Sequence, residues 1–535
     1  MRRNNIVSDI IQQIRAEYDS TPYESFPFPQ SAPPYLAAIA HLFGLKAPDP
    51  EKARILELGC ASGGNIIPLA IRHPHARVTG IDLSQVQIET GQRIVKELAL
   101  DNIELRLGDL TEIGPELGTF DYIICHGVFS WVPAHVQAAI LRICKDNLAA
   151  DGIAYISYNT YPGWKAKEVI RDAMILRGKD PRAGSNQLGF ARGIIDFLKD
   201  VAPRQSLLAH ILEEHSPVLR QSRDYYLQHE FLEACNSPIY FSEFLAAANE
   251  VGLGYLAEAN LSTMFASNYG AKIAEPLLKE CEGNQARLEQ YLDFVTNRTF
   301  RQTVLVHKER TDQIRYGLDA ERLTSLHVAA FLPAHDASPA PLDSAPRHYG
   351  PQGLDPVTLR TPVVKVAADI LTEQWPATLS FTAIASAVKK KLGKRYPAAA
   401  EDELVNLIEV LVIQNRAKIS LKPVGAASDK PAGKIVLPEP WRSYGAATAN
   451  EGTPHIANAW HEAIMLDPAE QHLLARLDGS ASRDALVGHL IDCAEQGKVS
   501  FEVAGERLTD PERVRSGADE HVERVLSNFA KRFIL

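Results

Sequence analysis

Between residues 53 and 159 the chain alternates short apolar stretches with stretches of helical periodicity. The apolar stretches read ARILELG, VTGIDLS, IELRLGDL, FDYIICHG and GIAYISYN. Strands that alternate with helices predict βαβ units, in which a helix carries the chain back so that successive strands run parallel. The alternation therefore restricts this segment to the α/β class with a Rossmann-like sheet, and such sheets bind ligands beyond the carboxyl ends of their strands.

The 535 residues are too many for one hydrophobic core, so several domains are expected. Residues 1–50 begin with a helical pattern at Ile6, Ile10, Ile11 and Ile14 and continue as an aromatic, proline-rich stretch that we expect to cover a site. In chain order, the further predicted segments are a Rossmann-like domain (51–185), a helical region with strand candidates near 252–259 and 300–309 (186–330), a linker (333–356), a winged-helix-like domain (357–423) and a mostly helical C-terminal domain (440–535).

Composition and charge argue against several classes of protein. The net charge of −10 does not suit wholesale coating of nucleic acid, and the basic stretch KKKLGKR at 389–395 is interpreted as a solvated helix face. Six scattered cysteines without a C-x-x-C pair favour free thiols. There is no run of 18 apolar residues and no apolar signal core, so we expect a cytoplasmic protein without membrane insertion. The histidines show no spacing typical of metal sites, so no metal is expected.

The first predicted strand runs into a glycine-containing turn and then a helix. In ILELGCASGGN, residues 55–65, Gly59 and Gly63 let the backbone approach a ligand closely. Asp82 ends the second strand 23 residues after Gly59, where a carboxylate can bind both hydroxyls of a ribose, and Asp109 ends the third, where adenine would lie. A dinucleotide site shares these features, but a pyrophosphate requires G-x-G-x-x-G, and this turn reads G-C-A-S-G-G.

The pattern E-L-G-x-x-x-G followed by G-I-D-L-S resembles motif I and its partner in class I S-adenosylmethionine (SAM)-dependent methyltransferases. Ala61 departs from the middle glycine that many members have. The resemblance implies that SAM is the cofactor and that the backbone at Cys60 and Ala61 lines its methionine part. The residues expected to bind it are Glu57, Gly59, Cys60, Ala61, Gly63, Asp82, Leu83, Asp109, Leu110 and His126.

A class I methyltransferase sheet has seven strands, whereas only five predicted strands precede residue 160. We expect the sixth and seventh strands within GLGYLAEA (252–259) and FRQTVLVHKE (300–309), after a helical insertion. The alternative is that these two strands belong to a separate domain.

Aromatic residues gather where the fourth and fifth strands end. HGVFSW supplies His126, Phe129 and Trp131, YNTYPGW supplies Tyr158, Asn159, Tyr161 and Trp164, and the N-terminal PYESFPFPQ adds Tyr23, Phe26 and Phe28. A lysine amine attacks only when neutral, and burial against rings lowers its pKa while ring faces tolerate the cation on entry. We therefore expect an acceptor side suited to lysine, formed by His126, Tyr158, Tyr161, Trp164 and Tyr23.

Other acceptors and roles stay open at this point. Methyltransferases acting on adenine N6 or glutamine amides have an Asn/Asp-Pro-Pro-aromatic tetrapeptide where this chain has HGVF, which argues against those two acceptors. His126 can equally be a hydrogen-bonded core histidine, and the rings can serve packing alone. The alternatives for the whole chain are a small-molecule or lipid methyltransferase and a non-catalytic SAM-binding regulatory protein.

Several stretches together closely resemble bacterial protein lysine methyltransferases that carry a methyltransferase regulatory domain. They are ELGCASGGN, HGVFSWVP, SYNTYPGW, YDSTPYESFPFPQ, PIYFSEFL and NRTFRQTVLVHK, and more loosely NAWHEAIMLDPAEQHLLARLDGSASRDALV. Characterised relatives methylate lysines of outer-membrane surface proteins. The resemblance thus implies a protein substrate, a regulatory region, a C-terminal domain with winged-helix character and often a homodimer.

The sequence departs from the family pattern at two places near the expected acceptor mouth. Lys165 stands where the family commonly has His, and the chain reads Gln-Ser-Ala-Pro from Gln30 where the family often has Gln-Thr-His-Pro. The acceptor is therefore less firmly implied than the cofactor.

Overall fold

The computed structural model describes residues 15, 18, 19, 23–184, 186–221, 227–233, 235–336, 342–425, 436–503 and 506–532. The helical pattern expected over residues 6–14 lies outside the described residues. None of the described helices combines the length and the apolar character that crossing a bilayer requires.

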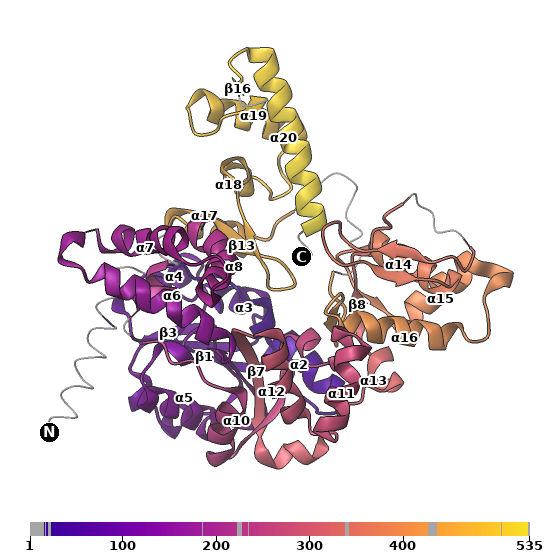
Figure 1. Ribbon diagram of the computed structural model, residues 1–535. Helices are drawn as coiled ribbons and strands as arrows, with labels where there is room; N and C mark the ends of the chain where they lie inside the picture. The colour runs from indigo at the N-terminus through magenta and orange to yellow at the C-terminus, as the bar shows by residue number, and fades with distance from the viewer. Residues whose placement is uncertain are drawn as a thin grey trace.

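A seven-stranded sheet forms the centre of the molecule (Figure 1). Its strands are β1 (Arg54–Leu58), β2 (Arg77–Asp82), β3 (Ile103–Leu107), β4 (Phe120–Cys125), β5 (Leu148–Asn159), β6 (Leu253–Glu258) and β7 (Phe300–His307). Their order is β3-β2-β1-β4-β5-β7-β6. The first five strands run parallel, and β7 is antiparallel to both β5 and β6. The predicted Rossmann-like sheet is confirmed, and the sixth and seventh strands complete it rather than forming a separate domain.

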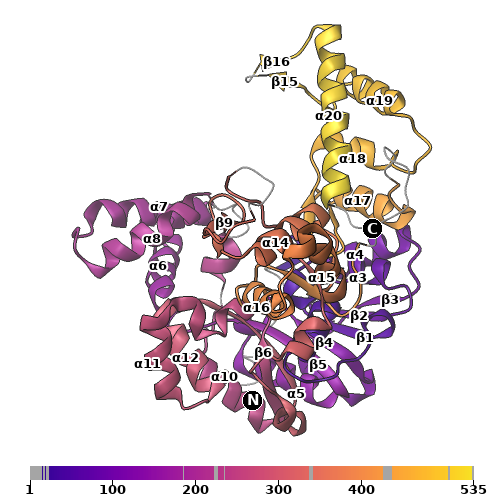
Figure 2. The same cartoon turned by 90° about the vertical axis from the view of Figure 1, so that its right-hand side faces the viewer.

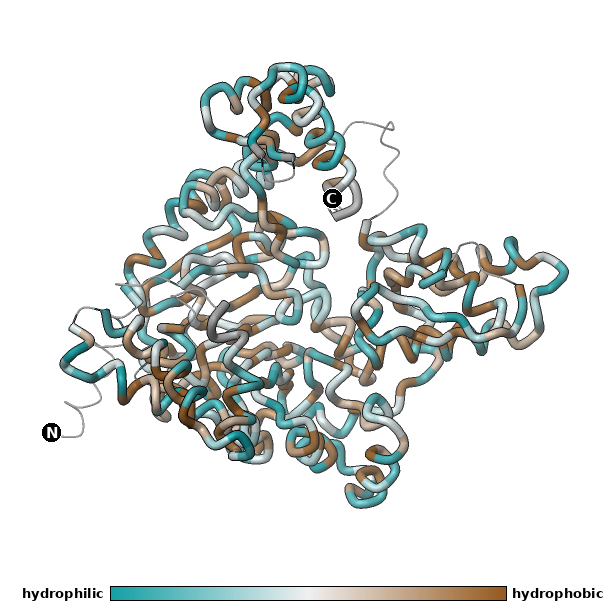
Figure 3. Tube along the Cα trace, turned by 45° about the horizontal axis from the view of Figure 1, so that its top comes forward, coloured by the Kyte–Doolittle hydropathy of each residue, from teal (hydrophilic) through white to brown (hydrophobic). Residues whose placement is uncertain are grey.

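Helices connect the parallel strands and bury them. The connecting helices are α3 (Ile67–Arg72), α4 (Gln85–Glu97) and α5 (Ala134–Asp146), and α2 (Pro33–Leu42) precedes the sheet. A parallel strand covered on both faces reads as a nearly continuous apolar run, and four of the five residues of β1 are buried. In Figure 3 hydrophobic segments gather in the body of the molecule, whereas outer loops are mainly hydrophilic.

A helical insertion lies between β5 and β6. Helices α6 (Gly163–Gly178), α7 (Gln187–Val201) and α8 (Leu207–Gln221) project from the sheet (Figure 2) and share a separate apolar cluster that includes Ile170, Met174 and Ile195. Helix α10 (Phe241–Glu250) leads into β6, and α11 (Ala271–Cys281) and α12 (Gln285–Thr296) connect β6 to β7.

A buried charge cluster joins α12 to the last two strands. The guanidinium of Arg301 on β7 lies 2.8 Å from Glu258 on β6 and 2.8 Å and 3.2 Å from Asp293 and Glu289 on α12. All four side chains are at most 2% exposed. Burying these charges is tolerable only because each is paired.

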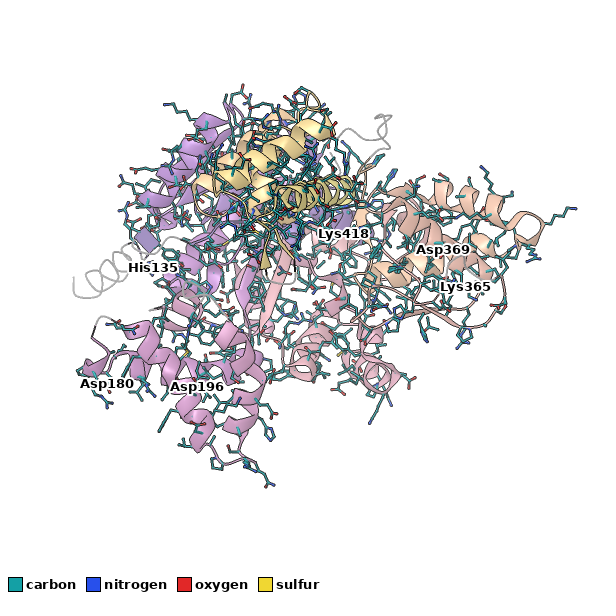
Figure 4. All side chains as sticks on the ribbon, turned by 90° about the horizontal axis from the view of Figure 1, so that it is seen from above. His135, Asp180, Asp196, Lys365, Asp369 and Lys418 are labelled. Carbon is teal, nitrogen blue, oxygen red and sulfur yellow. The ribbon has the colours of Figure 1, made fainter. Side chains whose placement is uncertain are left out.

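The segment expected to be a linker over 333–356 is partly ordered. Strand β9 (Arg347–Tyr349) pairs with β10 (Val357–Leu359). The buried Lys365 of α14 (Pro362–Gln374) donates to the carboxylate and the carbonyl oxygen of Asp343 at 2.9 Å and 3.1 Å; Lys365 is labelled in Figure 4. A proline-rich stretch can thus be ordered by contact with a folded neighbour, which its composition does not reveal.

Two smaller units follow the sheet. The first has the predicted three helices, α14, α15 (Phe381–Leu392) and α16 (Ala400–Ile413), and a three-stranded sheet of order β11-β8-β12, formed by Leu379–Ser380, His327–Ala329 and Lys418–Ser420. The second contains α17 (Glu439–Asn450), α18 (Pro468–Leu474), α19 (Arg483–Glu495) and α20 (Pro511–Arg532), with the hairpins β13/β14 (His455–Ala457, Ala463–Met465) and β15/β16 (Glu502–Val503, Glu506–Arg507). The long α20 rises from the body of the molecule in Figure 1.

Candidate functional site

A cavity of about 430 Å³ lies at the carboxyl ends of β1 to β5. Residues that follow these strands line one part of it. Side chains from the N-terminal segment and from the helical insertion line the remainder, among them Tyr23, Phe28, Trp164 and Glu230. The cavity therefore occupies the position at which an open parallel sheet binds its ligand.

The turn after β1 adopts the backbone that its sequence predicts. Gly59 has φ = 74°, and its amide and that of Cys60 donate to the carbonyl of Ile81 at 2.8 Å and 3.1 Å. Ala61, which replaces the usual glycine, also has a left-handed φ of 48°. Gly63 was expected to bind the cofactor, but it does not line the cavity. It packs against Ile67 at the start of α3 and allows this helix to lie close to the sheet.

Asp82 presents its carboxylate to the cavity from the end of β2. The amide of Ala61 donates to Asp82 Oδ2 at 2.8 Å, and that of Ser84 donates to Oδ1 at 2.9 Å. These two bonds fix the orientation of the carboxylate. Of the other residues predicted for the cofactor, Leu83, Asp109 and Leu110 line the cavity together with Cys60 and Ala61.

Glu57 is a buried carboxyl group with one unused oxygen. Its Oε1 accepts from Asn65 Nδ2 at 2.7 Å, whereas Oε2 has no hydrogen-bond partner among the described residues. Burial raises the pKa of Glu57 to about 8. Because Glu57 lines the cavity, its unused oxygen is available to a cationic group of a ligand there.

The N-terminal segment covers His126. The ring of Phe28 stacks on His126 with centroids 3.7 Å apart, and His126 Nδ1 lies 2.9 Å from the hydroxyl of Tyr155. Burial lowers the pKa of His126 to about 4, so the imidazole is neutral at physiological pH and is a weak base. His126 lines the cavity, but as a neutral, hydrogen-bonded ring.

Two predicted tyrosines do not reach the cavity. Tyr158 lies on the opposite face of β5 from Asn159, because successive strand residues alternate; its hydroxyl lies 3.0 Å from that of Thr303, and its ring stacks on Phe244. Asn159 lines the cavity instead. Tyr161 donates to Glu168 at 2.6 Å from outside the cavity.

Three further residues that we expected near the acceptor also lie outside the cavity. Phe129 packs edge-on against Phe244, away from the cavity, and Phe26 packs against His455 of the C-terminal unit. The ammonium of Lys165 lies 4.2 Å from the centre of the Tyr161 ring. The departure at Lys165 therefore falls beside Tyr161 and not in the cavity wall.

The acceptor side of the cavity combines two predicted tryptophans, Trp131 and Trp164, with two residues that sequence reasoning missed, Lys167 and Glu230. Trp164 and Trp131 meet edge to face with centroids 6.2 Å apart. The ammonium of Lys167 lies 4.9 Å from the centre of the Trp164 ring and 3.5 Å from the carboxylate of Glu230. Burial raises the pKa of Glu230, while Lys167 opposes the rise. Glu230 follows Trp164 by 66 positions across the helical insertion, so no local pattern signals their contact.

Outside the cavity, three potential metal ligands lie near one another in α18 and α19. The ligand atoms of His472, His489 and Cys493 all lie within 4.8 Å of each other. His489 Nε2 also lies 3.2 Å from the carbonyl oxygen of His472, at hydrogen-bond distance. The expectation that the chain holds no metal remains a prediction.

Comparison with known proteins identifies three regions of the chain. Residues 55–152 match the family model of a methyltransferase domain, residues 223–307 that of a predicted methyltransferase regulatory domain, and residues 441–534 that of the C-terminal winged helix domain of PKMT. The winged helix domain thus falls in the C-terminal segment 440–535, which we expected to be mostly helical without predicting a winged helix there. Its strands of two or three residues are too short to show alternation in the sequence.

Two of the proteins that this chain resembles align with it over nearly its whole length. The chain is 33% identical over 526 residues to an uncharacterized protein of Rickettsia prowazekii, covering 97% of this chain and 93% of that one. A second protein of that organism is 35% identical over 237 residues, covering 44% and 95%. The solved structure of PKMT2 from Rickettsia typhi in complex with AdoHcy is 28% identical, with a TM-score of 0.85, and covers 96% of this chain and 100% of that one.

Proposed function

Because the chain belongs to the bacterial protein lysine methyltransferase family, we propose that it transfers methyl groups to lysine side-chain amines of proteins. Its fold is that of the class I methyltransferases, and its cofactor is SAM. The residues on the acceptor side of the cavity support lysine as the methyl acceptor.

The residues of the cavity suit each part of SAM. Asp82 is held with its carboxylate toward the cavity, where it can accept from two ribose hydroxyls, and Asp109 and Leu110 border the position expected for adenine. Glu57 offers to the ammonium of the amino-acid part a buried oxygen that no described residue pairs with. When bound, SAM supplies an electrophilic methyl group, so the protein must deliver a neutral amine in line with it.

One observation carries the choice of lysine: the cavity wall already accommodates an ammonium group. Lys167 lies between the ring face of Trp164 and the carboxylate of Glu230, the two kinds of group that stabilise a primary ammonium away from bulk water. A lysine of a protein substrate would find the same two partners by competing with Lys167 for Glu230. A lipid or an apolar small molecule carries no ammonium group for the Trp164 ring and the Glu230 carboxylate to bind.

Glu230 is also placed to take the proton that the acceptor must lose. Lysine attacks through its nitrogen lone pair, so one N–H proton has to leave the ammonium before methyl transfer. Burial raises the pKa of Glu230, which makes it a better proton acceptor than an exposed glutamate. The surrounding rings of Trp131 and Trp164 exclude water and favour the neutral amine.

Replacing Glu230 with glutamine should lower kcat about tenfold at pH 7, because proton acceptance contributes at least this factor in such sites. The deficit should shrink as the pH rises toward the pKa of the free lysine amine, about 10.4. Steady-state kinetics from pH 7 to 10 measure this. Tyr161→Phe is the matched control, since Tyr161 lies outside the cavity, and it should leave kcat within twofold. A deficit of Glu230→Gln that is independent of pH would contradict the proton-accepting role.

Cofactor affinity should depend on pH through Glu57. Glu57 has a pKa of about 8 in the free protein, so below that pH it must release a proton before it can pair with a ligand ammonium. The affinity for S-adenosylhomocysteine should therefore rise with pH up to about 8, by at most about tenfold per unit for one proton. Isothermal titration in buffers of different ionisation enthalpy measures both affinity and proton release. In Glu57→Gln, which keeps the bond with Asn65, proton release should disappear; release that persists would contradict the assignment.

Blocking lysine amines tests the acceptor class directly. A protein extract of the source cell is divided, and one half is acetylated with acetic anhydride so that its lysines cannot accept a methyl group. Incubated with labelled SAM, the untreated half should take up label and the acetylated half should not. Equal labelling of both halves would exclude lysine, and label in the low-molecular-weight fraction would favour a small-molecule acceptor. Absence of label despite cofactor binding would favour a regulatory role.

A further inference from the structure

A loop of the C-terminal unit reaches the wall of the cofactor cavity. Residues 458–462 connect β13 to β14, and the buried His461 in this loop has a left-handed φ of 59°. Its Nε2 lies 2.9 Å from Asn65 Oδ1, across 396 positions of sequence. A non-glycine residue in this conformation costs energy, so the surrounding contacts must hold it in place.

Asn65 connects this histidine to the cavity. Its Oδ1 accepts from the backbone amide of Phe28 at 2.9 Å, which fixes the amide orientation and directs Nδ2 to Glu57 at 2.7 Å. Because Oδ1 is an acceptor, the Nε2 of His461 carries the proton and donates to it. Burial lowers the pKa of His461 to about 3, so the imidazole donates as a neutral group.

Further contacts hold the loop against the rest of the protein. The indole nitrogen of Trp460 donates to the carbonyl oxygen of Pro376 at 3.2 Å, and Glu462 pairs with Lys418 of β12, labelled in Figure 4. On the other side, the guanidinium of Arg72 in α3 lies 5.0 Å from the centre of the Trp441 ring. Residues of the unit that contains α14 to α16 thus hold the loop in place. The C-terminal unit also packs on α3, the helix that follows the glycine turn.

We propose that His461 is a positioning residue through which the C-terminal winged helix domain completes the amino-acid end of the cofactor site. Three neighbours hold the Asn65 amide: His461 from the C-terminal unit, and Phe28 and Ser31 from the N-terminal cover, with Ser31 Oγ accepting from Asn65 Nδ2 at 3.1 Å. Asn65 in turn holds Glu57 Oε1. Glu57 lines the cavity, and its Oε2 has no hydrogen-bond partner in the described part of the chain. Without the His461 bond, the Asn65 amide keeps only its bonds to Phe28 and Ser31, so Asn65 holds Glu57 less firmly in its orientation.

The chemistry of SAM indicates which part of the cofactor depends on the orientation of Glu57. The ribose hydroxyls are neutral donors that Asp82 can bind, and adenine carries no positive charge at neutral pH. The ammonium of the amino-acid part is the group that requires a buried carboxylate, and Glu57 is a buried carboxyl group of the cavity whose Oε2 lacks a hydrogen-bond partner among the described residues. The inference therefore predicts a defect confined to ligands that possess an amino-acid part.

Two ligands separate this role from a merely structural one. S-adenosylhomocysteine has the amino-acid part, whereas 5′-methylthioadenosine retains the nucleoside and lacks it. Isothermal titration of the full chain carrying His461→Asn should show about tenfold weaker binding of S-adenosylhomocysteine, the worth of one hydrogen bond in a charged network. Binding of 5′-methylthioadenosine should stay within twofold of wild type.

Two substitutions remove the donor in different ways. Asparagine tolerates the left-handed backbone but is too short to reach Asn65, and His461→Phe keeps the ring volume. The control Glu451→Gln breaks the ion pair between Glu451 and Arg93, in which Arg93 Nη2 lies 2.6 Å from the carboxylate, without touching Asn65. It should leave both affinities unchanged. The inference is supported if both His461 variants lose S-adenosylhomocysteine selectively.

Equal losses of both ligands, or no loss of either, would overturn the inference. If His461→Asn loses its folded circular dichroism signal, the two titrations of His461→Phe decide. The inference rests on cofactor binding and not on the acceptor. Failure of the wild-type chain to bind S-adenosylhomocysteine would contradict the proposed function, whereas normal binding by the wild type and both variants would contradict this inference alone.

Discussion

Asp82→Ala should weaken binding of S-adenosylhomocysteine at least about 100-fold, equivalent to about 3 kcal/mol, because two charge-assisted hydrogen bonds to ribose are lost. The carboxylate is oriented by the amides of Ala61 and Ser84 before any ligand binds, so its loss removes a prepared site. Binding of 5′-methylthioadenosine should fall by the same factor, since this ligand has the same ribose. Titration calorimetry on the purified variant measures both losses.

A carboxylate outside the cavity provides the control for Asp82. Asp121 on β4 pairs with Arg54 at 3.0 Å at the opposite end of the strand from the cavity. Asp121→Ala should bind both ligands as the wild type does. The assignment of Asp82 would be wrong if its variant folds normally and binds either ligand within threefold of wild type.

Arg301→Met should destabilise the protein by about 3–5 kcal/mol, the cost of leaving buried charges without their partner. Arg301 neutralises Glu258, Glu289 and Asp293 in a region where all four side chains are at most 2% exposed. Its guanidinium also lies 3.5 Å from the centre of the Phe241 ring. Since the cluster joins α12 to β6 and β7, urea unfolding followed by circular dichroism should show a lower midpoint for the sheet.

The surface pair of Arg54 and Asp121 offers the comparison for Arg301. Arg54 is 48% exposed, so Arg54→Met should cost less than about 1 kcal/mol. Combining Arg301→Met with Glu258→Gln and Glu289→Gln should recover part of the lost stability, because fewer unpaired charges remain. A loss below 1 kcal/mol for Arg301→Met alone would show that the cluster does not hold α12 to the sheet.

The sheet and the cofactor side were predictable because their signals are local. The number of residues between Gly59 and Asp82 is set by the length of one βαβ unit. Both residues lie in stretches whose strand or helix periodicity is clear from the sequence. The sixth and seventh strands were also predictable, since GLGYLAEA and TVLVHKE are strand-like and the resemblance to class I methyltransferases implied a sheet of seven strands. Asp82, Asp109 and Glu57 reach the cavity as expected.

The acceptor side was less predictable because orientation and distant contacts decide it. Tyr158 and Asn159 are neighbours in sequence, yet the pleat of β5 sends only Asn159 toward the cavity. Tyr161 lies just beyond the strand and turns to Glu168. Glu230 and His461 reach the site from the helical insertion and from the C-terminal domain, and neither carries a local motif.

Locating the transferred methyl group tests the central claim most directly. The protein is incubated with SAM bearing a deuterated methyl group and a protein extract of the source cell, and the digested extract is sequenced by mass spectrometry. The account predicts deuterated methyl groups on lysine side chains, with the signal greatly reduced for Asp82→Ala. Deuterated methyl groups on carboxylates or in the low-molecular-weight fraction, with none on lysine, would contradict it.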